Sequence, residues 1–399
     1  MRSLNDYKGI TGEKEVQKIY EESSPLENKH VEHINSTFYG GGVAEILSSL
    51  VLLMNDVGIT TGWRLLKGHP DFFNATKRFH NALQGSSIVL GENTKKIYLE
   101  TNETNSIFMH IGLADAIIVH DPHPLPLINF YEKKQPWIWR CHIDLSNPNP
   151  GLWEYLKQFI LKYDSAIVSI EKYKKQDLTL PHYIIPPSID PLTNKNKLIP
   201  DYVVKKYISK FGIDSDKPII SQISRFDKWK DPLGVIKAFE IIQKEVDCKL
   251  VLLGSMATDD PEGHIIFENL LKKVKGNPNI HLINHADDFL VNCLQRASDI
   301  VIQKSIKEGF GLTVTEALWK GKPVVAGNVG GIPLQLIDGK NGYLVNSIRE
   351  CADRTVNLLK NPKLREEMGK FGVEHVRRNF LITRHLMDYI RLLKDQLKA

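Results

Sequence analysis

Residues 297–328 read ASDIVIQKSIKEGFGLTVTEALWKGKPVVAGN, and this stretch decides the fold class. Short apolar runs at 297–305 and 322–328 predict two strands, and the segment between them predicts a loop followed by a helix. Short apolar strands that take turns with helices are typical of a parallel sheet with helices on both faces. The stretch therefore predicts an α/β protein.

The same alternation continues along the rest of the chain. In the first half, a predicted strand at 31–37 precedes a helix from Val43 to Met54. The other predicted strands lie at 61–68, 114–121, 136–144, 165–170, 218–224, 248–255 and 280–285. A charged helical tail begins near Ile348.

The alternation weakens once, between Pro186 and Pro218. This segment is rich in Pro, Asn, Asp and Lys, and it predicts an interdomain linker near 187–200. A chain of 399 residues fits two domains of about 150 to 200 residues each. We therefore expect two doubly wound α/β domains in tandem, 1–195 and 196–379.

The composition is that of a globular protein without a nucleic-acid partner. The chain has 52 Lys and Arg against 47 Asp and Glu, so its net charge of +5 is too diffuse for a nucleic-acid footprint. The four cysteines lie far apart and predict neither a zinc site nor a disulfide framework. No apolar run is long enough to span a membrane, and the first residues lack the apolar core of a signal peptide. We therefore expect a cytoplasmic protein with no membrane partner.

Ligands of open parallel sheets bind beyond the carboxyl ends of the strands, so we expect the ligand-binding residues in the loops that follow strands. YGGGVAE at 39–45 is such a loop. Gly40, Gly41 and Gly42 would let the backbone approach a ligand and would leave N–H groups free for a sugar or phosphate oxygen. Glu45 breaks the G-x-G-x-x-G spacing, which disfavours a dinucleotide. A flexible strand-to-helix turn is the alternative.

The second loop is SRFDKWKDP at 224–232, in which Asp231 and Pro232 signal the start of a helix. Arg225 and Lys230 therefore project at a strand's carboxyl end beside a helix N-terminus. A diphosphate would meet both fixed and dipolar positive charge there. Two solvated loop cations are the alternative.

Two more loops of the first half, at 120–127 and 140–146, each follow an apolar strand. Their polar side chains are His120, Asp121, His123, His142 and Asp144. H-x-x-H in a proline-bearing loop is poor ligand geometry, which disfavours a metal site. Sugar hydroxyls need matched donors and acceptors such as His and Asp, so we expect a polar sugar pocket. The alternative is that these side chains only satisfy backbone groups of their own loops.

The opening stretch itself carries two glutamates, Glu308 and Glu316. Thr313 and Glu316 match the spacing of a capping box, which gives Glu316 a structural alternative. Glu308 lies in the loop outside that box. The backbone N–H groups of Gly311 and Leu312 would point outward at the helix start, which predicts an anion site. We therefore expect the helix start to bind phosphate and the carboxylates to bind hydroxyl groups.

These residues carry a family resemblance. EGFGLTVTE at 308–316, together with RFDKWK at 225–230, resembles the donor site of retaining nucleotide-sugar glycosyltransferases of the GT-B fold, family 4. The first half narrows the resemblance to the trehalose glycosyltransferring synthases. The stretches that carry it lie at 38–68, 72–85, 120–127 and 136–146.

The resemblance implies a GT-B architecture in which two Rossmann-like domains face a deep cleft. Residues 1–195 would form the acceptor-side domain, joined by a C-terminal helix at about 380–399 that crosses back to it. Residues 196–379 would bind the nucleotide sugar.

The resemblance also implies residue roles. Arg225 and Lys230 would neutralise the diphosphate, Glu316 would hold the ribose, and Glu308 would hold the donor glucose. His285 stands where the family commonly has glycine, so the preferred base is not predicted. The implied donor-binding set is Arg225, Lys230, Gly309, Phe310, Gly311, Leu312, Glu316, Asn284 and His285. The implied acceptor and sugar-binding set is Gly40, Gly41, Gly42, His142, Asp144 and Asp121. The implied catalytic set is Glu308, His142, Arg225 and Lys230.

The implied activity is retaining transfer of glucose from ADP-, UDP- or GDP-glucose to free glucose, which forms α,α-trehalose reversibly. Arg225, Lys230 and the helix start can stabilise the charge that develops on the leaving diphosphate. No Asp or Glu stands out as a nucleophile, so we expect same-face attack in which the leaving phosphate oxygen accepts the acceptor's proton. The motifs require no metal, although Mg²⁺ would assist the free nucleotide.

Three alternatives to this activity remain open. A retaining trehalose phosphorylase would use phosphate in place of a nucleotide, and another family-4 hexosyltransferase would use a different acceptor. A non-catalytic sensor of nucleotide sugars would keep the diphosphate residues and could dispense with His142 and Glu308. The oligomeric state is also open, with a homodimer as the oligomer considered.

Overall fold

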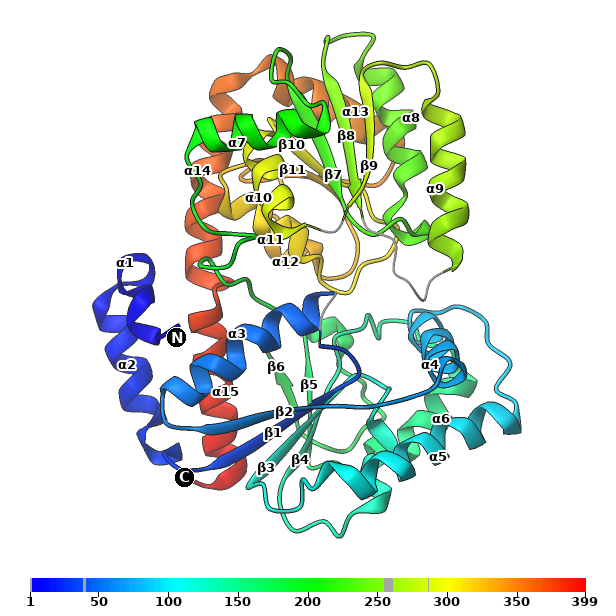
Figure 1. Cartoon of the computed structure of the whole chain (residues 1–399), viewed down its shortest axis with the longest axis vertical. Helices are drawn as coiled ribbons and strands as arrows, with labels where there is room; N and C mark the ends of the chain where they lie inside the picture. The colour runs from blue at the N-terminus through cyan, green and yellow to red at the C-terminus, as the bar shows by residue number, and fades with distance from the viewer. Residues whose placement is uncertain (1, 39–40, 255–260, 286) are drawn as a thin grey trace. The chain divides into compact units, whose positions relative to one another are not determined.

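The computed structural model describes residues 2–38, 41–254, 261–285 and 287–399, without the side chains of 261 and 262. The chain forms two compact units (Figure 1). Unit 1 comprises Met1–Ser188 and Ile382–Ala399, and unit 2 comprises Ile189–Leu381.

The units divide at Ser188 and Ile189, where the sequence placed the boundary after residue 195. The physical reason lies in the backbone of unit 2. The N–H of Ile189 donates to the carbonyl of Phe380 at 2.9 Å, and Ile189 forms a parallel bridge with Leu381. These contacts attach the chain to unit 2 from Ile189 onward.

The rest of the predicted linker also packs within unit 2. Asn196 is buried, and its Nδ2 donates to the carbonyl of Asp190 at 3.2 Å. Lys320 Nζ donates to Asn196 Oδ1 at 2.9 Å. The segment 189–200 is therefore an ordered part of unit 2 and not a solvated connection.

Unit 1 contains a six-stranded parallel sheet of strand order β2-β1-β3-β4-β5-β6. The strands are β1 (His30–Asn35), β2 (Thr60–Leu65), β3 (Ala116–His120), β4 (Trp137–Arg140), β5 (Ser165–Val168) and β6 (His182–Ile184). Every residue of β3 and β4 is buried, because helices cover both faces of a parallel sheet. His120 and Arg140 pair at the ends of these strands, so the loops that follow start side by side.

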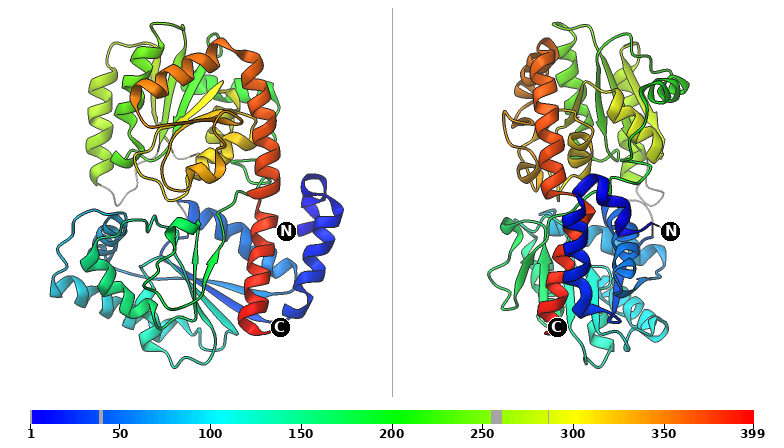
Figure 2. Two further views of the ribbon diagram at one scale, coloured as in Figure 1. Left: turned by 180° about the vertical axis from the view of Figure 1, so that it is seen from behind. Right: turned by 90° about the vertical axis from the view of Figure 1, so that its left-hand side faces the viewer.

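Helices α4, α5 and α6 cover one face of this sheet (Figure 1). Alternate strand residues face opposite ways, and Ile117, Val119 and Trp137 join the core on this face. On the other face, Tyr389 of α15 meets the ring of His33. Both views show α15 running alongside α2 (Figure 2). The helices are α1 (Lys8–Thr11), α2 (Glu13–Ser23), α3 (Gly42–Asp56), α4 (Pro70–Leu83), α5 (Glu92–Met109), α6 (Pro150–Ile160) and α15 (Ile382–Leu397).

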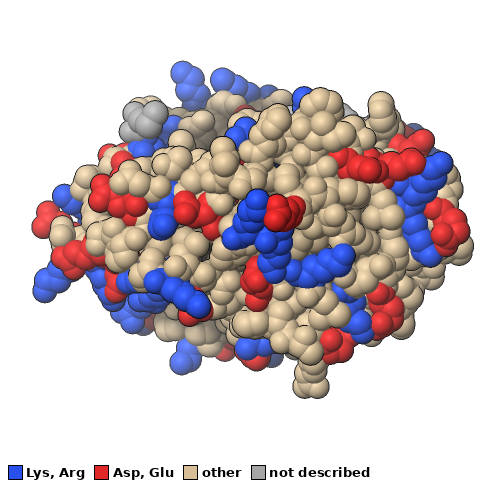
Figure 3. Space-filling view, turned by 90° about the horizontal axis from the view of Figure 1, so that it is seen from below, with Lys and Arg blue, Asp and Glu red and all other residues tan. Residues whose placement is uncertain are grey.

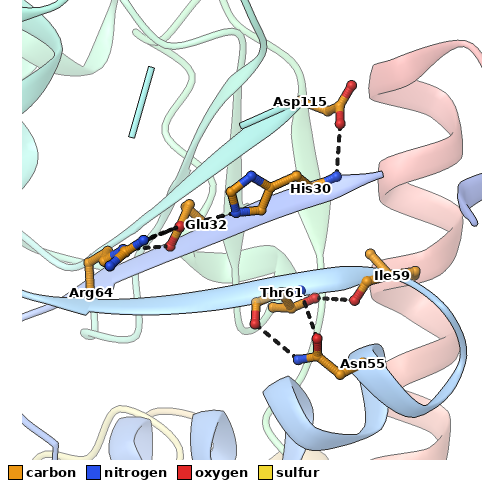
Figure 4. A network of polar contacts seen from close by, with 7 residues as sticks. All are labelled: His30, Glu32, Asn55, Ile59, Thr61, Arg64 and Asp115. Atoms are coloured by element: carbon orange, nitrogen blue, oxygen red, sulfur yellow. Dashed lines mark hydrogen bonds and ion pairs between the residues drawn. The ribbon is translucent and has the colours of Figure 1, made fainter. Parts of the chain in front are cut away.

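A polar network fixes β2 against β1 and α3 (Figure 4). The buried Glu32 carboxylate accepts hydrogen bonds from Arg64 Nε and Nη2, the latter at 3.0 Å. A Cβ on Gly62 would lie 2.3 Å from Glu32 Oε2, so a larger residue there would displace this carboxylate. Asn55 of α3 binds both the N–H and the carbonyl of Thr61 at 3.0 Å. The network therefore positions α3, whose first turn follows the predicted glycine loop.

Unit 2 contains a second six-stranded parallel sheet, of order β12-β11-β10-β7-β8-β9. The strands are β7 (Ile219–Ile223), β8 (Lys249–Gly254), β9 (Ile280–Asn284), β10 (Ile300–Gln303), β11 (Val324–Gly327) and β12 (Gly342–Val345). The helices are α7 (Asp201–Ile208), α8 (Pro232–Ile242), α9 (Pro261–Val274), α10 (Asp288–Ala297), α11 (Leu312–Trp319), α12 (Ile332–Gln335), α13 (Ile348–Lys360) and α14 (Pro362–Asn379).

Two apolar cores lie on the two faces of the second sheet. Leu250 and Leu252 pack with α8 and α13, whereas Val251 and Leu253 pack with α7 and α10. The alternation follows from the two-residue period of a strand. Both units are thus doubly wound α/β sheets, which confirms the predicted fold class.

The surface agrees with the diffuse charge of the sequence. On the face drawn in Figure 3, Lys and Arg side chains are interspersed with Asp and Glu. Among the helices of the described ranges, none has the length and apolarity to cross a membrane.

Candidate functional site

The predicted lysine and glutamate meet in unit 2. Lys230 Nζ forms an ion pair with Glu308 Oε2, and Ser305 Oγ donates to the same oxygen at 3.2 Å. The Glu308 residue is 9% exposed, so the pair is largely shielded from water. Lys230 follows β7 and Glu308 follows β10, and these strands are neighbours in the sheet. Neighbouring parallel strands end at one edge, which brings the two loops together.

The loop between β7 and α8 fixes the backbone of Lys230. Asp227 Oδ1 accepts from the backbone N–H groups of Trp229 at 2.8 Å and Lys230 at 3.1 Å. Gln222 Nε2 donates to the carbonyl of Lys230 at 2.7 Å, which ties the loop to β7. The backbone that carries the ammonium group is therefore held from both sides.

Arg225 lies in the same loop and behaves differently. Its side chain is 52% exposed, and its Nη2 lies 3.9 Å from Asp227 Oδ2. The solvated-cation alternative therefore describes Arg225 as the structure has it, but it does not describe Lys230. A solvent-exposed guanidinium at the end of a strand has the space to turn toward an anion.

Helix α11 begins beside Glu308. Gly311 is its N-cap at φ +86° with no side-chain cap, and Leu312 is its first residue. A Cβ on Gly311 would lie 3.1 Å from Glu308 Cγ in a backbone conformation that other residues avoid. Within the described residues, no side chain or loop carbonyl accepts from the N–H groups of Gly311 and Leu312. These groups are arranged for an anion.

The loop before α11 is anchored by its own backbone and by one aromatic ring. The carbonyl of Gly309 accepts from the N–H of Gly331 at 3.1 Å. Phe310 is buried, and its ring centroid lies 5.8 Å from that of Phe380. Phe310, predicted as a donor-binding residue, thus has a packing role that holds the loop in place.

The capping-box alternative for Glu316 is wrong. A capping box would need Thr313 at the N-cap, but the N-cap of α11 is Gly311, so Thr313 lies inside the helix. The Oγ1 of Thr313 donates instead to the carbonyl of Ile223 at 3.3 Å. Glu316 is 3% exposed, and its Oε2 accepts from Gln295 Nε2 at 3.3 Å. Glu316 therefore has no cap function, and a hydroxyl-binding role stays a prediction.

Asn284 and His285 lie where the sequence placed the base-reading loop. Asn284 ends β9, and both residues are exposed. The N–H of His285 donates to the carbonyl of Gly254 at 2.8 Å, and its ring lies 5.6 Å from that of Phe211. The arrangement presents an exposed imidazole beside a second ring at the strand end.

In unit 1, Asp121 and His142 follow neighbouring strands and bind each other. Asp121 Oδ1 accepts from the backbone N–H of His142 at 2.8 Å, and the Asp121 N–H donates to the carbonyl of Arg140 at 2.8 Å. Asp121 adopts φ +61°, a conformation that Asp tolerates better than most residues. Burial raises the pKa of the Asp121 carboxyl to about 6, against the lowering effects of the His142 N–H and of Arg140. Asp121 thus positions the backbone of His142.

The imidazole of His142 contacts that of His120, which in turn contacts that of His33. Its Nε2 lies 2.9 Å from His120 Nδ1, and His120 Nε2 lies 2.9 Å from His33 Nδ1. The rings stack at centroid distances of 5.3 Å and 5.2 Å. Burial lowers the pKa of all three, for His33 to about 3.

Of the remaining polar residues of these loops, Asp144 serves the backbone of its own loop. Asp144 Oδ1 accepts from the N–H of Ser146 at 2.8 Å, and the carbonyl of His123 accepts from Asn102 Nδ2 at 3.1 Å. Among the described side chains, no three His, Cys, Asp or Glu residues are grouped as metal ligands. A sugar contact of Asp144 stays a prediction.

The glycine loop is described in part. Gly40 lies outside the described residues. Gly41 is the N-cap of α3 at φ +87°, exposed and without a side-chain cap, and Gly42 is the first residue of the helix. The start of α3 therefore has no side-chain cap, and its contact with a sugar or phosphate oxygen stays a prediction.

Sequence reasoning missed three residues that complete these arrangements. His33 is buried on β1, whose sequence HVEHIN mixes polar and apolar residues, so no local pattern singled it out. Asp227 lies two positions before Trp229, a spacing typical of a local side-chain cap. Ser305 gave no signal, because its contact with Glu308 depends on the path of the loop.

Comparisons with known proteins cover both units. A family model described as "Trehalose synthase, N-terminal domain" matches residues 33–175, and one described as "Glycosyl transferases group 1" matches 203–375. A trehalose synthase of Pyrococcus horikoshii is 47% identical over 99% of this chain and 96% of its own length. A trehalose synthase of Rubrobacter xylanophilus is 43% identical over 98% and 96%. A trehalose phosphorylase of Pleurotus pulmonarius is 25% identical over 94% of this chain but only 58% of its own length.

Solved structures show the same architecture. A sucrose-phosphate synthase of Thermosynechococcus elongatus superimposes with a TM-score of 0.72 at 16% identity, over 93% of this chain and 100% of that one. Anabaena HepE, in complex with UDP and glucose, superimposes with a TM-score of 0.68 at 14% identity, over 92% and 100%. Together with the two parallel sheets, these similarities confirm the predicted two-domain GT-B fold.

Proposed function

Because the chain belongs to the trehalose synthase family of glycosyltransferases, we propose that it transfers glucose from a nucleoside-diphosphate glucose to free glucose. The product is α,α-trehalose, the anomeric configuration of the donor is retained, and the reaction is reversible. The observation that carries this proposal is the Lys230–Glu308 pair beside the uncapped start of α11.

The donor half of the proposal is supported by charge and by free backbone donors. An ammonium group and the N–H groups of a helix start together attract a diphosphate, and both stabilise the charge that grows on it as the glycosidic bond breaks. Arg225 adds a second cation from the same loop. Glu308 accepts hydrogen bonds and is placed to bind a donor hydroxyl next to Lys230.

The chemistry follows from what these residues offer. The bond between glucose C1 and the phosphate oxygen breaks, the acceptor oxygen bonds to C1 on the same face, and the acceptor's proton passes to the departing phosphate oxygen. Glu308 is already engaged with Lys230 and Ser305, which disfavours it as a nucleophile. No step needs a divalent metal, and Mg²⁺ acts only on the free nucleotide.

Relatives support the choice of substrates. The HepE structure contains UDP and glucose, and another structural neighbour is bound with UDP-2-fluoro glucose. The trehalose phosphorylase similarity is lower and spans little more than half of that protein. The full-length similarity to trehalose synthases therefore favours a nucleotide sugar over phosphate.

The test is release of nucleoside diphosphate. The protein is incubated with glucose and ADP-, UDP- or GDP-glucose, with and without phosphate and with a chelator. We expect diphosphate release that depends on glucose, does not need phosphate and survives the chelator. A requirement for phosphate would instead assign the phosphorylase reaction, and release with a different acceptor only would assign another family-4 transferase.

A further inference from the structure

Three imidazoles form a continuous hydrogen-bonded row across unit 1. The histidine row consists of His33 on β1, His120 at the end of β3 and His142 just after β4, which are consecutive strands of the sheet. His33 and His120 are buried, whereas His142 is only half-buried. Each contact joins Nδ1 of one ring to Nε2 of the next at 2.9 Å. The row therefore leads from the core to the surface.

The rings of the histidine row are neutral at physiological pH. Burial disfavours the imidazolium form of each, and the fully buried guanidinium of Arg140 disfavours it further for His120 and His142. The groups that face the row from α15 are His385 and Tyr389, and His385 has a lowered pKa of its own. A neutral imidazole carries one N–H and one lone pair.

Because each neutral ring carries only one N–H, the tautomer of each ring depends on the tautomers of its neighbours. His120 contacts a ring nitrogen on each side, so it must donate to one neighbour and accept from the other. If it donates to His142, then His33 donates to it, and all three rings carry hydrogen on Nδ1. If it donates to His33, all three carry hydrogen on Nε2. Any mixture would set two lone pairs or two N–H groups against each other.

The inner end of the row selects between the two arrangements. His33 Nε2 is buried and has no hydrogen-bond partner among the described residues. In the Nε2–H arrangement this atom would be a buried donor without an acceptor, which folded proteins rarely contain. In the Nδ1–H arrangement it is only a bare lone pair. The outer end, His142 Nδ1, makes no hydrogen bond within the described part of the chain.

We propose that the histidine row locks His142 as a neutral hydrogen-bond donor, with Nδ1–H directed to a sugar hydroxyl, and that His120 is the positioning residue. The choice of a sugar as the ligand rests on the proposed function, whereas the tautomer does not. The Nε2 lone pair of His142 is occupied by His120, so His142 is not the base that accepts the acceptor's proton. That proton passes to the departing phosphate oxygen.

Nuclear magnetic resonance of the protein labelled with ¹⁵N-histidine tests the tautomer directly. At neutral pH, couplings to ring protons should show Nδ1 protonated and Nε2 bare in all three rings. The signals are assigned with His33→Gln, His120→Gln and His142→Gln. Hydrogen on Nε2, a mixture of tautomers, or a charged ring in the row would each overturn the proposal.

Two variants of His120 test the positioning role. Gln offers a carbonyl that can accept from His33 and an amide that can donate to His142, whereas Leu offers neither. His120→Leu should lower kcat at least about tenfold, the loss expected for one misplaced hydrogen bond, and should change the His142 spectrum. His120→Gln should recover most of the turnover. The control His281→Leu removes a half-buried imidazole of unit 2, whose Nε2 is shielded from solvent, and should leave the spectrum of the row unchanged.

The outcomes separate this inference from the proposed function. Equal losses in His120→Leu and His120→Gln, without a change at His142, would reduce His120 to a packing residue. A wild-type protein that forms no trehalose but shows three Nδ1–H rings would contradict the proposed function and leave the tautomer lock standing.

Discussion

At the residue scale, the Lys230–Glu308 pair is the most constrained feature of the donor half. Side-chain exposures of 17% and 10% leave little water to replace a lost partner. Removing one member of a buried pair leaves an uncompensated charge, which costs on the order of 3 kcal/mol. The pair therefore links stability to activity at one position.

The first prediction uses two lysines of one loop. Lys230→Ala should lower kcat/KM about tenfold to a hundredfold, because a diphosphate loses a charge-assisted hydrogen bond, and should lower the melting temperature. Lys228→Ala removes the same charge two positions away, over the Trp229 ring, and should leave both nearly unchanged. Adding Glu308→Gln to Lys230→Ala should restore part of the stability but not the turnover. Wild-type turnover in Lys230→Ala would show that Lys230 has only a structural role.

The second prediction separates the two glutamates. Glu316→Gln should raise the donor KM, because a ribose hydroxyl loses its charged acceptor, and should change the melting temperature little. Glu308→Gln should lower kcat more than donor affinity, because only contacts that strengthen in the transition state raise the chemical rate. Steady-state kinetics and melting curves on both variants measure this. An unchanged donor KM in Glu316→Gln would remove that residue from the site.

The third prediction concerns Asp121, because burial raises the pKa of its carboxyl to about 6 from an ordinary value of 3.8. Between these values the folded state holds a proton that the unfolded state has released, so the free energy of unfolding falls as pH rises through the folded pKa. Asp121→Asn keeps the acceptor for the His142 N–H and cannot ionise. The variant should therefore gain stability over the wild type between pH 4 and pH 7, as measured by chemical denaturation. A difference that does not vary with pH would contradict the raised pKa.

At the element scale, the start of α11 depends on the conformation of Gly311. A non-glycine residue in the left-handed region costs about 1–2 kcal/mol. Gly212 also has positive φ, with open space around its Cβ position, and it lies in another loop of unit 2. Gly212→Ala should therefore lower stability by about this amount, and Gly311→Ala by at least as much because its Cβ would crowd Glu308, while only Gly311→Ala weakens donor binding. Equal donor affinity in the two variants would show that the helix start does not bind the donor.

The elements were predictable because their signals are local. Apolar runs followed by helical spacing located the strands, and Asp231 with Pro232 located the start of α8. The sequence left two positions open for the start of α11, because the helix was expected to begin at Gly311 and Leu312 while Thr313 also matches a capping box; the helix begins at Leu312. Apolar runs do not encode strand order, so the sequence did not show that β7 and β10 are neighbours. That adjacency is what joins Lys230 to Glu308.

In unit 1, the sequence placed Asp121 and His142 in adjoining loops and left open whether their side chains bind sugar or satisfy backbone groups. Both were predicted to contact sugar, and the structure shows the Asp121 carboxylate on the backbone of His142. The contact between His33 and His120 needs a register between strands far apart in the sequence. Long-range side-chain contacts of this kind follow from packing and not from local pattern.

At the scale of the whole molecule, the two sheets carry distinct chemistry. In the proposed function, unit 2 would supply cations and free amides for an anion, and unit 1 would supply neutral imidazoles and glycine amides for hydroxyl groups. The division fits transfer from a charged donor to an uncharged acceptor. Two relatives that match 98% or more of this chain and 96% of their own length are trehalose synthases.

One measurement tests the central claim most directly. The protein is incubated with unlabelled nucleoside-diphosphate glucose and [1-¹³C]glucose without phosphate, and the product is examined by nuclear magnetic resonance. We predict one non-reducing disaccharide in which the labelled and unlabelled anomeric carbons are linked and both are α. A labelled carbon that still equilibrates between anomers, as in a reducing disaccharide such as maltose, would contradict trehalose synthesis.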